Sequence, residues 1–546
     1  MDDSAVLSFQ SNRSPVLGRR GMVASSQPLA TEAGLQILRR GGNAADAAVA
    51  TAAALNVTEP NMTGIGGDVF SLYYDARTGD VTALNGSGRT PKGLTIERLV
   101  SDGITDEIPL YHAHSITVPG ACAGWFDLIA RHGRLAMGEI LAPAIGLAEE
   151  GFPVAPITAR LWSASLGPVQ RSPGGAALMI EGRGPRPGEI FRNPGLAQTF
   201  QRIAEGGAKA FYQGEIAEAI ASLVQSHGGS LCEEDLAQHE STWDEPISSL
   251  YRGLRLWECP PNGQGLAALL ALNILRGMNL EDQEPLGAQR FHLMIEAMRL
   301  AFEDARWYVA DPRHATTPRI PLDELLSEDY ASTRRKQIDP DHANPHPKRG
   351  APIASSDTVY LCCVDVDGNA CSFINSNYMA FGSGLSPEGF GFTLQNRAQQ
   401  MRLDRSHPDA VAPGKRPYHT IIPALLTRDR DGSLYGPMGV MGGFMQPQGH
   451  LQVTVAMADD DCDPQAALDR PRFGLMAGLG AGLVSVESGL PTATQSALSA
   501  MGHELRNVEG LARIQFGRGQ IIRRDTDGVL WGGSDPRADG CAMAQS

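Results

Sequence analysis

A threonine at position 358 stands where a polar stretch of the sequence meets an apolar one. Residues 336–357, KQIDPDHANPHPKRGAPIASSD, show no apolar period, whereas TVYLCCVDV directly after them is typical of a buried strand. A threonine hydroxyl is a weak nucleophile until a base stands beside it, and a free α-amino group with a pKa of about 7.7–8.0 is such a base. Cleavage between Asp357 and Thr358 would create both groups on one residue. The same local pattern also fits an ordinary strand residue after an ordinary loop.

Motifs for other kinds of catalysis are weak in this sequence. His112 and His114 in YHAHS have strand spacing and no acidic neighbour, so we expect core or surface histidines and not metal ligands. The segment TGIGGDV fits neither of the glycine motifs that bind nucleotides, and there is no GxSxG nucleophile elbow. A metal hydrolase, a nucleotide enzyme and an elbow-type serine hydrolase are therefore all disfavoured.

Periodic segments predict the elements that must position Thr358. Helices are expected over 28–42, over the Ala-rich segment 43–57, which should be deeply buried, and over 287–308. Residues 69–84 alternate like two strands around a turn. TVYLCCVDV and ACSFINS flank an Asp-Gly turn, which predicts a β-hairpin beginning at Thr358. Taken alone, these patterns predict a mixed α and β protein.

The composition limits the possible partners and compartments. The chain has 546 residues, 42% of them apolar and 20% charged, which is enough to bury a large core. A net charge of -15 argues against nucleic acid or an anionic membrane as the main partner. No apolar run suggests a signal peptide or a membrane span, so we expect a cytoplasmic protein. The eight cysteines show no CxxC spacing, which favours reduced thiols.

Motifs spread over nearly the whole chain resemble the γ-glutamyltransferase family of self-processing hydrolases. They are, in order, MVASSQPLATEAGLQILRRGGNAADAAVATAAALNVTEPNMTGIGGD, LNGSGRTP, SITVPGACAGW, DTVYLCCVDVDGNA, NSNYMAFGSGL, LQNR, APGKRP and MGVMGG. The resemblance implies an α+β fold, the four-layer αββα sandwich of N-terminal nucleophile hydrolases. It also implies a large subunit of residues 1–357, with 336–357 as a flexible linker, and an associated small subunit of residues 358–546. Both would belong to one structural body, and a higher oligomer is left open.

The same resemblance assigns catalytic roles by position. Thr358 falls on the family's nucleophile, Ser376 on a second hydroxyl that touches it, and Gly442 and Gly443 on the oxyanion hole. The implied reaction is attack of the Thr358 hydroxyl on an amide carbonyl, followed by hydrolysis of the acyl-enzyme. Attack of the same hydroxyl on the carbonyl of Asp357 would drive self-cleavage. The reaction needs no metal or organic cofactor.

The recognition residues depart from those of relatives that act on glutathione. The arginine that pairs with the glutamyl carboxylate corresponds to Ile96, the acidic residue that holds the α-amino group to Gln400, and a serine pair to His419-Thr420. These replacements put γ-glutamyl specificity in doubt, and LQNR and MGGFMQPQ are similar to the branch that includes oxamate amidohydrolase. Positive charge near the site is expected from Arg397, Lys415, Arg416 and His419, with Arg89 as a further candidate to bind a substrate anion.

The sequence therefore predicts a self-processing amidohydrolase whose substrate is a small amide, oxamate-like or another acyl amide. Alternatives within the family are a γ-glutamyl hydrolase or transpeptidase and a cephalosporin-acylase-like amidase. An unprocessed, non-catalytic binding protein is the alternative of another class.

Overall fold

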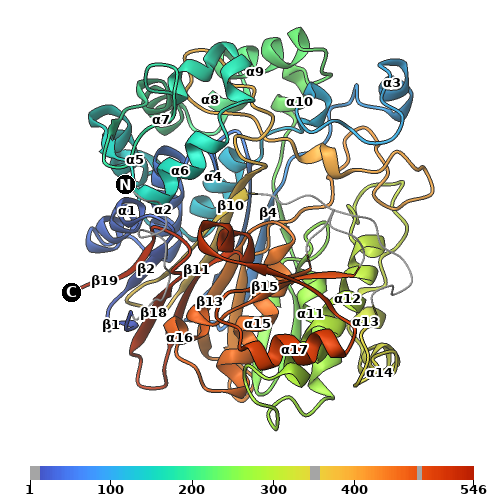
Figure 1. Ribbon diagram of the computed structural model, residues 1–546. Coiled ribbons are helices and arrows are strands. Elements are labelled where there is room, and N and C mark those ends of the chain that lie inside the picture. The colour runs from blue at the N-terminus through green and yellow to red at the C-terminus, as the bar shows by residue number, and fades with distance from the viewer. Residues whose placement is uncertain (1–12, 345–356, 476–481) are drawn as a thin grey trace.

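Two seven-stranded sheets form the centre of the molecule (Figure 1). The computed structural model describes residues 13–344, 357–475 and 482–546. The first sheet, called the β10 sheet, runs in the order β19 (Cys541–Ala544), β2 (Met22–Ser25), β10 (Asp357–Val364), β11 (Ala370–Tyr378), β3 (Asp68–Tyr74), β4 (Val81–Gly86) and β7 (Thr242–Asp244). The second, called the β13 sheet, runs β1 (Val16–Gly18), β18 (Leu530–Ser534), β17 (Arg518–Arg524), β13 (Leu434–Met441), β12 (Ala424–Arg428), β9 (Leu254–Glu258) and β8 (Ile247–Tyr251).

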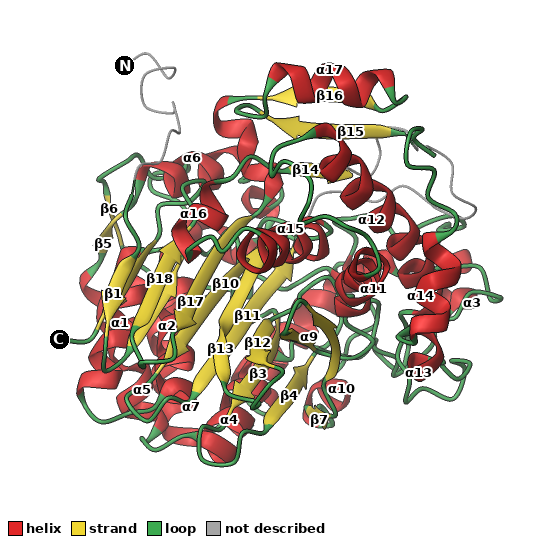
Figure 2. Ribbon diagram, turned by 90° about the horizontal axis from the view of Figure 1, so that it is seen from below, coloured by secondary structure: helices red, strands yellow, loops and turns green. Residues whose placement is uncertain are grey.

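Helices cover the outer face of each sheet (Figure 2). On the β10 sheet lie α1 (Pro28–Arg39), α2 (Ala44–Thr58) and α4 (Ala121–His132), with α5 (Met137–Glu150) and α7 (Pro194–Gly206) farther out. On the β13 sheet lie α11 (Gly265–Arg276), α15 (Met445–Asp459) and α16 (Pro464–Asp469), with α12 (Ala288–Tyr308) packed on α11. The architecture is therefore the expected four-layer αββα sandwich.

The elements predicted from periodicity are present. The predicted helices correspond to α1, α2 and α12, and the alternating segment 69–84 to β3 and β4. Every residue of α2 is buried, because its small alanines let α1, α5 and the β10 sheet approach closely. In the predicted linker, residues 336–344 form no helix or strand, and residues 345–356 lie outside the described residues.

The β10–β11 hairpin lies in the middle of its sheet, between strands from the N-terminal part of the chain. β10 pairs with β2, where Leu361 is opposite Ser25, and β11 pairs with β3, where Ser376 is opposite Asp68. Strands on both sides of position 358 thus share one set of backbone hydrogen bonds. If the chain is cut before Thr358, the two pieces remain joined through this sheet.

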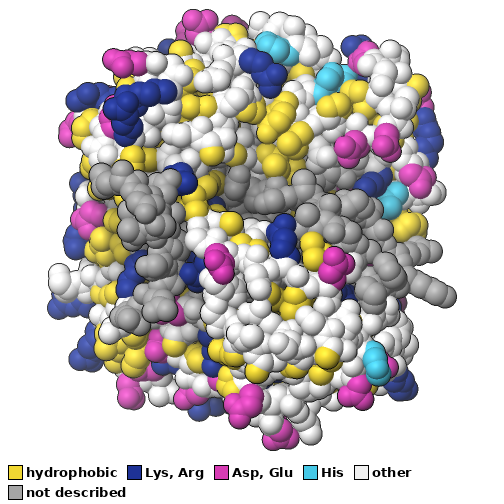
Figure 3. Space-filling view, viewed as in Figure 1, with side chains coloured by type: hydrophobic (Ala, Val, Ile, Leu, Met, Phe, Trp, Pro, Cys, Tyr) yellow, Lys and Arg dark blue, Asp and Glu magenta, His cyan; other side chains and the backbone are white. Residues whose placement is uncertain are grey.

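The surface and the cysteines carry little further functional information. On the face shown in Figure 3, acidic and basic side chains are interspersed. Within the described residues, no helix is both long and apolar enough to cross a membrane. All eight cysteines lie in the described part of the chain and are free thiols.

Candidate active site

Thr358 points into the space between the two sheets, toward the end of β13. Two residues later on the same face of β10, the Tyr360 ring covers Gly439 of β13, where an added Cβ would lie 2.4 Å from the ring. Farther along, Cys362 lies beside Ile522 of β17, which is next to the residue paired with Met438. From Cys362 back to Tyr360 on β10, the facing residue therefore moves toward the C-terminal end of β13. This register directs Thr358 toward the Gly442-Gly443 pair that follows β13.

The hydroxyls of Thr358 and Ser376 form the centre of the site. Both residues are buried, and their Oγ atoms lie 3.1 Å apart. Ser376 Oγ also accepts hydrogen bonds from the Tyr378 backbone N–H at 2.9 Å and from the Arg397 guanidinium at 3.0 Å. A hydroxyl has two acceptor lone pairs and one proton, and these two donors can occupy both lone pairs of Ser376. The arrangement therefore suits donation from Ser376 to the Thr358 oxygen.

Arg397 is a fully buried cation in this centre. Its guanidinium donates to Thr420 Oγ1 at 2.7 Å as well as to Ser376, and it lies 4.7 Å from the centre of the Tyr378 ring. Burial lowers the pKa of Arg397 to about 10, which still leaves it charged at neutral pH. Tyr378 has a φ of 75°, a conformation that is strained for a bulky residue. This backbone conformation places the Tyr378 ring against the Arg397 guanidinium.

The glycine pair adopts backbone conformations that favour glycine. Gly442 has a φ of 129° and Gly443 a φ of 57°, at the junction between β13 and α15. Gln264 fixes this junction because its side-chain amide donates to the Gly443 carbonyl at 2.9 Å and to the Thr420 carbonyl at 2.6 Å. Tyr418 in turn donates to the Gln264 side-chain oxygen at 3.1 Å. The arrangement suits a pair of fixed backbone donors.

His419 is neutral, which corrects the expectation that it adds positive charge. Its Nδ1 accepts from the Ile421 N–H, so its Nε2 carries the proton and donates to Asp68 at 3.1 Å. Burial, and then the nearby Arg397 charge, lower the pKa of His419 to about 4. Asp68 also accepts from the backbone N–H groups of Gly88 and Gly120. The histidine therefore positions this loop and supplies no cation.

The other proposed cations contact different parts of the molecule. The Lys415 ammonium donates to the Pro408 carbonyl at 2.6 Å, and the Arg416 guanidinium to the Ser87 carbonyl at 3.0 Å. The Arg89 guanidinium donates to the Glu240 carbonyl at 3.2 Å. Ile96, the counterpart of the glutamyl-binding arginine, packs on the small apolar cluster that contains Ala398. Of the expected cations, Arg397 is the one bonded to the Thr358–Ser376 pair.

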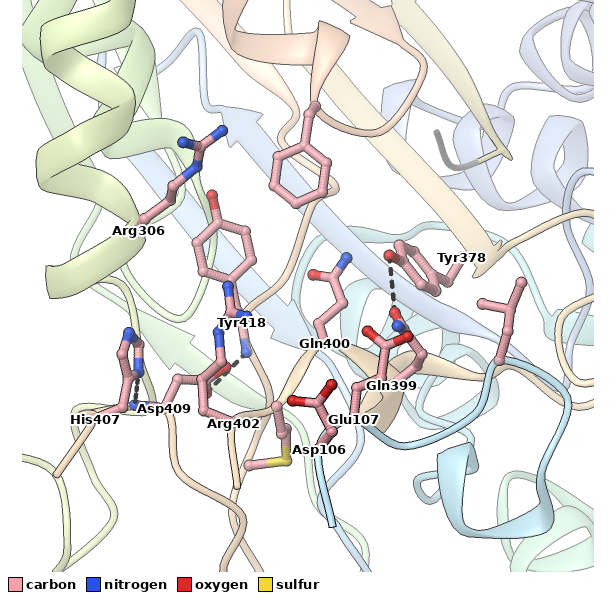
Figure 4. A pocket seen from close by; sticks show the side chains of 13 residues that line it. Asp106, Glu107, Arg306, Tyr378, Gln399, Gln400, Arg402, His407, Asp409 and Tyr418 are labelled. Carbon is pink, nitrogen blue, oxygen red and sulfur yellow. Dashed lines mark hydrogen bonds between the residues drawn. The ribbon is translucent and has the colours of Figure 1, made fainter. Parts of the chain in front are cut away.

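A cavity of about 280 Å³ adjoins these residues. Figure 4 shows the Gln400 side chain between the rings of Tyr418 and Tyr378. Two of the residues that line it are neighbours in the sequence of expected site residues: Tyr378 follows Ser376 by two residues, and Phe444 follows Gly443 directly. Its wall mixes aromatic rings with charged groups of both signs; the charged residues are Asp106, Glu107, Arg306, Arg402 and Asp409. Such a wall can bind an acyl group with an apolar body and a polar end.

Two groups of histidines lie away from this cavity. His114 lies in the 3-10 helix Ala113–Ser115 instead of a strand, and its Nε2 is 2.8 Å from Asp102, a carboxylate that the sequence did not associate with it. His292, Glu296 and His503 form a buried group of metal-binding type at α12. The two imidazoles bond to each other at 2.8 Å and Glu296 pairs with Arg299 at 2.7 Å, so each of the three side chains has a partner within the protein.

Three residues of the site were not found from the sequence: Asp68, Gln264 and Tyr378. Asp68 ends the segment TGIGGD, Gln264 lies in PPNGQG, and Tyr378 lies in NSNYMAFGSGL; none of these segments indicated a particular partner for the residue. The roles of Asp68 and Gln264 depend on contacts between segments more than 100 residues apart, such as Gln264 with Gly443.

Comparison with known proteins agrees with this geometry. The model of the family described as gamma-glutamyltranspeptidase matches residues 30–545. The chain belongs to this family. Among gamma-glutamyltranspeptidase relatives, the glutathione hydrolase-like YwrD proenzyme of Bacillus subtilis is 37% identical over 97% of this chain and 99% of its own length. The oxamate amidohydrolase proenzyme of Klebsiella pneumoniae is 33% identical, over 96% and 98%.

Solved structures place the fold in the same gamma-glutamyltranspeptidase group. The crystal structure of cephalosporin acylase from Bacillus halodurans superposes with a TM-score of 0.93 at 45% identity, covering 100% of this chain and 99% of that one. The whole chain, including both seven-stranded sheets, therefore has a counterpart in that structure.

Proposed function

We propose that this member of the gamma-glutamyltranspeptidase family cleaves itself between Asp357 and Thr358 and then hydrolyses a small amide through Thr358. The observation that carries the proposal is the contact between the buried Thr358 and Ser376 hydroxyls, at the first residues of a central strand. With Ser376 as the donor of this hydrogen bond, its hydroxyl can stabilise negative charge that develops on the Thr358 oxygen. Residues 1–357 and 358–546 would then be the two associated subunits.

The self-cleavage step begins in the unbroken chain. The Thr358 hydroxyl attacks the carbonyl carbon of Asp357, the peptide C–N bond breaks, and the acyl group moves from nitrogen to oxygen. Water then hydrolyses the ester, which leaves a carboxylate on Asp357 and a free amino group on Thr358.

The amide reaction uses the same oxygen. The new α-amino group accepts the Thr358 hydroxyl proton while the oxygen attacks the substrate carbonyl, and this proton then goes to the leaving amine. The N–H groups of Gly442 and Gly443 are the proposed donors to the oxyanion, an effect of about 10²–10³ in rate for each donor. Water attacks the acyl-enzyme and releases the acid.

The substrate-binding residues remain proposals of different strength. Gln400 lines the cavity, and Thr420 and His419 lie on the loop held by Gln264. Arg397 reaches the catalytic hydroxyls, whereas Arg89 reaches a carbonyl on another segment. An oxamate-like amide fits the buried cation close to the nucleophile. The cavity of about 280 Å³ favours a second candidate, an amide with a longer acyl chain, as in the cephalosporin acylase type.

Intact mass spectrometry of the purified protein, with N-terminal sequencing of each fragment, tests the proposal. The expected result is a fragment that begins TVYLCC in the wild type and is absent in Thr358→Ala. In Thr358→Ser the corresponding fragment should form more slowly. Cleaved protein is then assayed with oxamate, γ-glutamyl amides and glutaryl amides. A chain that stays at full length and hydrolyses none of them would contradict the enzyme and favour a binding protein.

A further inference from the structure

The environment of Arg397 differs from that of an arginine that only stabilises the fold. In the described part of the chain no ion pair joins Arg397 to a carboxylate; its guanidinium contacts two hydroxyls and an aromatic ring. Its Nε is buried without a hydrogen-bond partner. A buried cation normally requires a paired anion, because the protein interior solvates charge poorly. Because no carboxylate contacts the Arg397 guanidinium, its charge can act on the neighbouring side chains and backbone.

Thr358, the proposed nucleophile, lies close to this charge. The guanidinium donates to Ser376 Oγ at 3.0 Å, and that oxygen lies 3.1 Å from Thr358 Oγ1. The α-nitrogen of Thr358 is separated from its Oγ1 by only two carbon atoms. After cleavage this nitrogen becomes an amine, and it must be neutral to accept the hydroxyl proton.

The surrounding charged groups compensate Arg397 only in part. Tyr378 stays neutral, since burial raises its pKa to about 12, and His419 is neutral as described. The nearest anion is Asp68 on β3, which attracts Arg397 without contacting it and is itself held by His419 and two backbone N–H groups. Glu59, at the end of α2, faces Arg518 of β17. Asp46 and Asp365 lie near the opposite end of β10.

We propose that Arg397 is a positioning residue for Thr358, which directs the Ser376 proton at the nucleophile and whose fixed charge keeps the newly formed α-amino group neutral. The inference rests on the proposed self-cleavage. At an effective dielectric constant of about 20, two positive unit charges roughly 6–10 Å apart repel enough to lower a pKa by roughly one to two units. The amine would then serve as a base well below its usual range of about 7.7–8.0.

The test is the pH dependence of kcat/KM for cleaved wild type, Arg397→Gln and Arg397→Lys. The substrate is the one that the wild type hydrolyses among oxamate, γ-glutamyl amides and glutaryl amides. Loss of the charge in Arg397→Gln should move the acidic limb upward by about one to two pH units, so that relative activity at pH 6 falls about 10- to 100-fold. Arg397→Lys keeps the charge and should leave the limb within about half a unit of the wild type.

A matched control and a second readout separate this role from others. Arg402→Gln removes a guanidinium from the cavity wall and should change KM without moving the limb. NMR of cleaved, ¹⁵N-threonine-labelled protein reports the amine pKa without any substrate, and should give the same shift for Arg397→Gln. A raised KM or lowered kcat with an unmoved limb and unmoved amine pKa would overturn the inference, and would favour substrate binding or a structural role.

The outcomes also distinguish this inference from the proposed function. A wild-type chain that is never cut has no such amine, and would overturn both. A cut, active wild type whose amine pKa does not respond to Arg397→Gln would overturn this inference alone. If Arg397→Gln fails to cleave itself, Arg397→Lys and the wild type still test it, because a wild-type amine pKa at or above about 8 would contradict it.

Discussion

The two ends of the β10–β11 hairpin hold buried polar groups in opposite ways. At the turn, both Asp365 carboxylate oxygens accept hydrogen bonds: Oδ1 from Asp367 and Asn369, Oδ2 from Ala44 and Asn369, all at 2.9–3.0 Å. At the open end, Arg397 faces the Thr358–Ser376 hydroxyls without an anion in contact. The carboxylate joins the turn to the first residue of α2, whereas the arginine leaves part of its charge for the neighbouring groups. The comparison distinguishes polar groups that stabilise a fold from those arranged for a reaction.

Among these variants, Gly442→Ala should lower the activity of the cleaved enzyme most strongly. The Gly442 φ of 129° is unfavourable for alanine, and an added Cβ would lie 3.2 Å from the Gly517 Cα, so the backbone donors must shift. We expect kcat of the cleaved enzyme to fall about 10²–10³-fold. Gly432→Ala is the matched control, because Gly432 also has a positive φ, 69°, but faces open space in the turn before β13. Equal losses in both variants would show that strain alone is responsible.

Ser376→Ala should have the next largest effect. It removes the hydroxyl that donates to Thr358 and leaves the Arg397 and Tyr378 donors without this acceptor. A hydrogen bond to a charged group contributes about 1.5–3 kcal/mol, or roughly 10–100-fold in rate. Self-cleavage followed by mass spectrometry, and kcat of any cleaved enzyme, should both fall by this amount. Ser376→Thr keeps a hydroxyl and should retain most of the wild-type rate. A Ser376→Ala enzyme that works at the wild-type rate would contradict a catalytic role for Ser376.

Asp365→Ala should affect stability more than chemistry. It leaves the Ala44 and Asn369 N–H groups without their acceptor at the junction of the turn with α2. The expected loss is about 1–3 kcal/mol in the free energy of unfolding, measured by urea denaturation. Asp365→Asn, which keeps one acceptor oxygen, should lose less. If instead the cleaved Asp365→Ala enzyme kept its stability and lost kcat, the contrast between the two ends would be wrong.

Arg134→Ala should have the smallest effect. Arg134 pairs with Asp367 in the same turn at 2.6 Å, but both side chains are about half exposed, at 46% and 51%. Solvent and salt screen such a pair, so we expect a change of about 0–1 kcal/mol in the free energy of unfolding that decreases further in high salt. A loss as large as that of Asp365→Ala would mean that the turn depends on the surface pair and not on the buried carboxylate.

Much of the scaffold could be predicted from the sequence because its signals are local. The Ala-rich pattern of residues 43–57 predicted a deeply buried helix, and the Asp-Gly turn predicted the hairpin; α2, β10 and β11 confirm both. The family and its sandwich fold followed from the order of the motifs. The linker 336–357 stays a prediction, since most of it lies outside the described residues.

The recognition side could be predicted only in part. The sequence suggested four cations near the site, but a side chain of that length can reach several partners, and of the four only Arg397 donates to the Ser376 hydroxyl. His419 was expected to be charged, yet burial and the Arg397 charge keep it neutral. Gln264 and Asp68 gave no signal because their partners are distant in the chain.

Local patterns in the sequence determined the helices and the hairpin that carries Thr358, because periodicity and turn chemistry are properties of neighbouring residues. The sandwich fold and the contact of Thr358 with Ser376 were predicted only from the resemblance to a known family. The tertiary structure decided which cation stands beside the Thr358–Ser376 pair, that His419 is neutral, and what lines the cavity. Those features depend on burial and on contacts between remote segments. Desolvation and charge act through space, and no spacing along the chain records which groups will meet inside the folded protein.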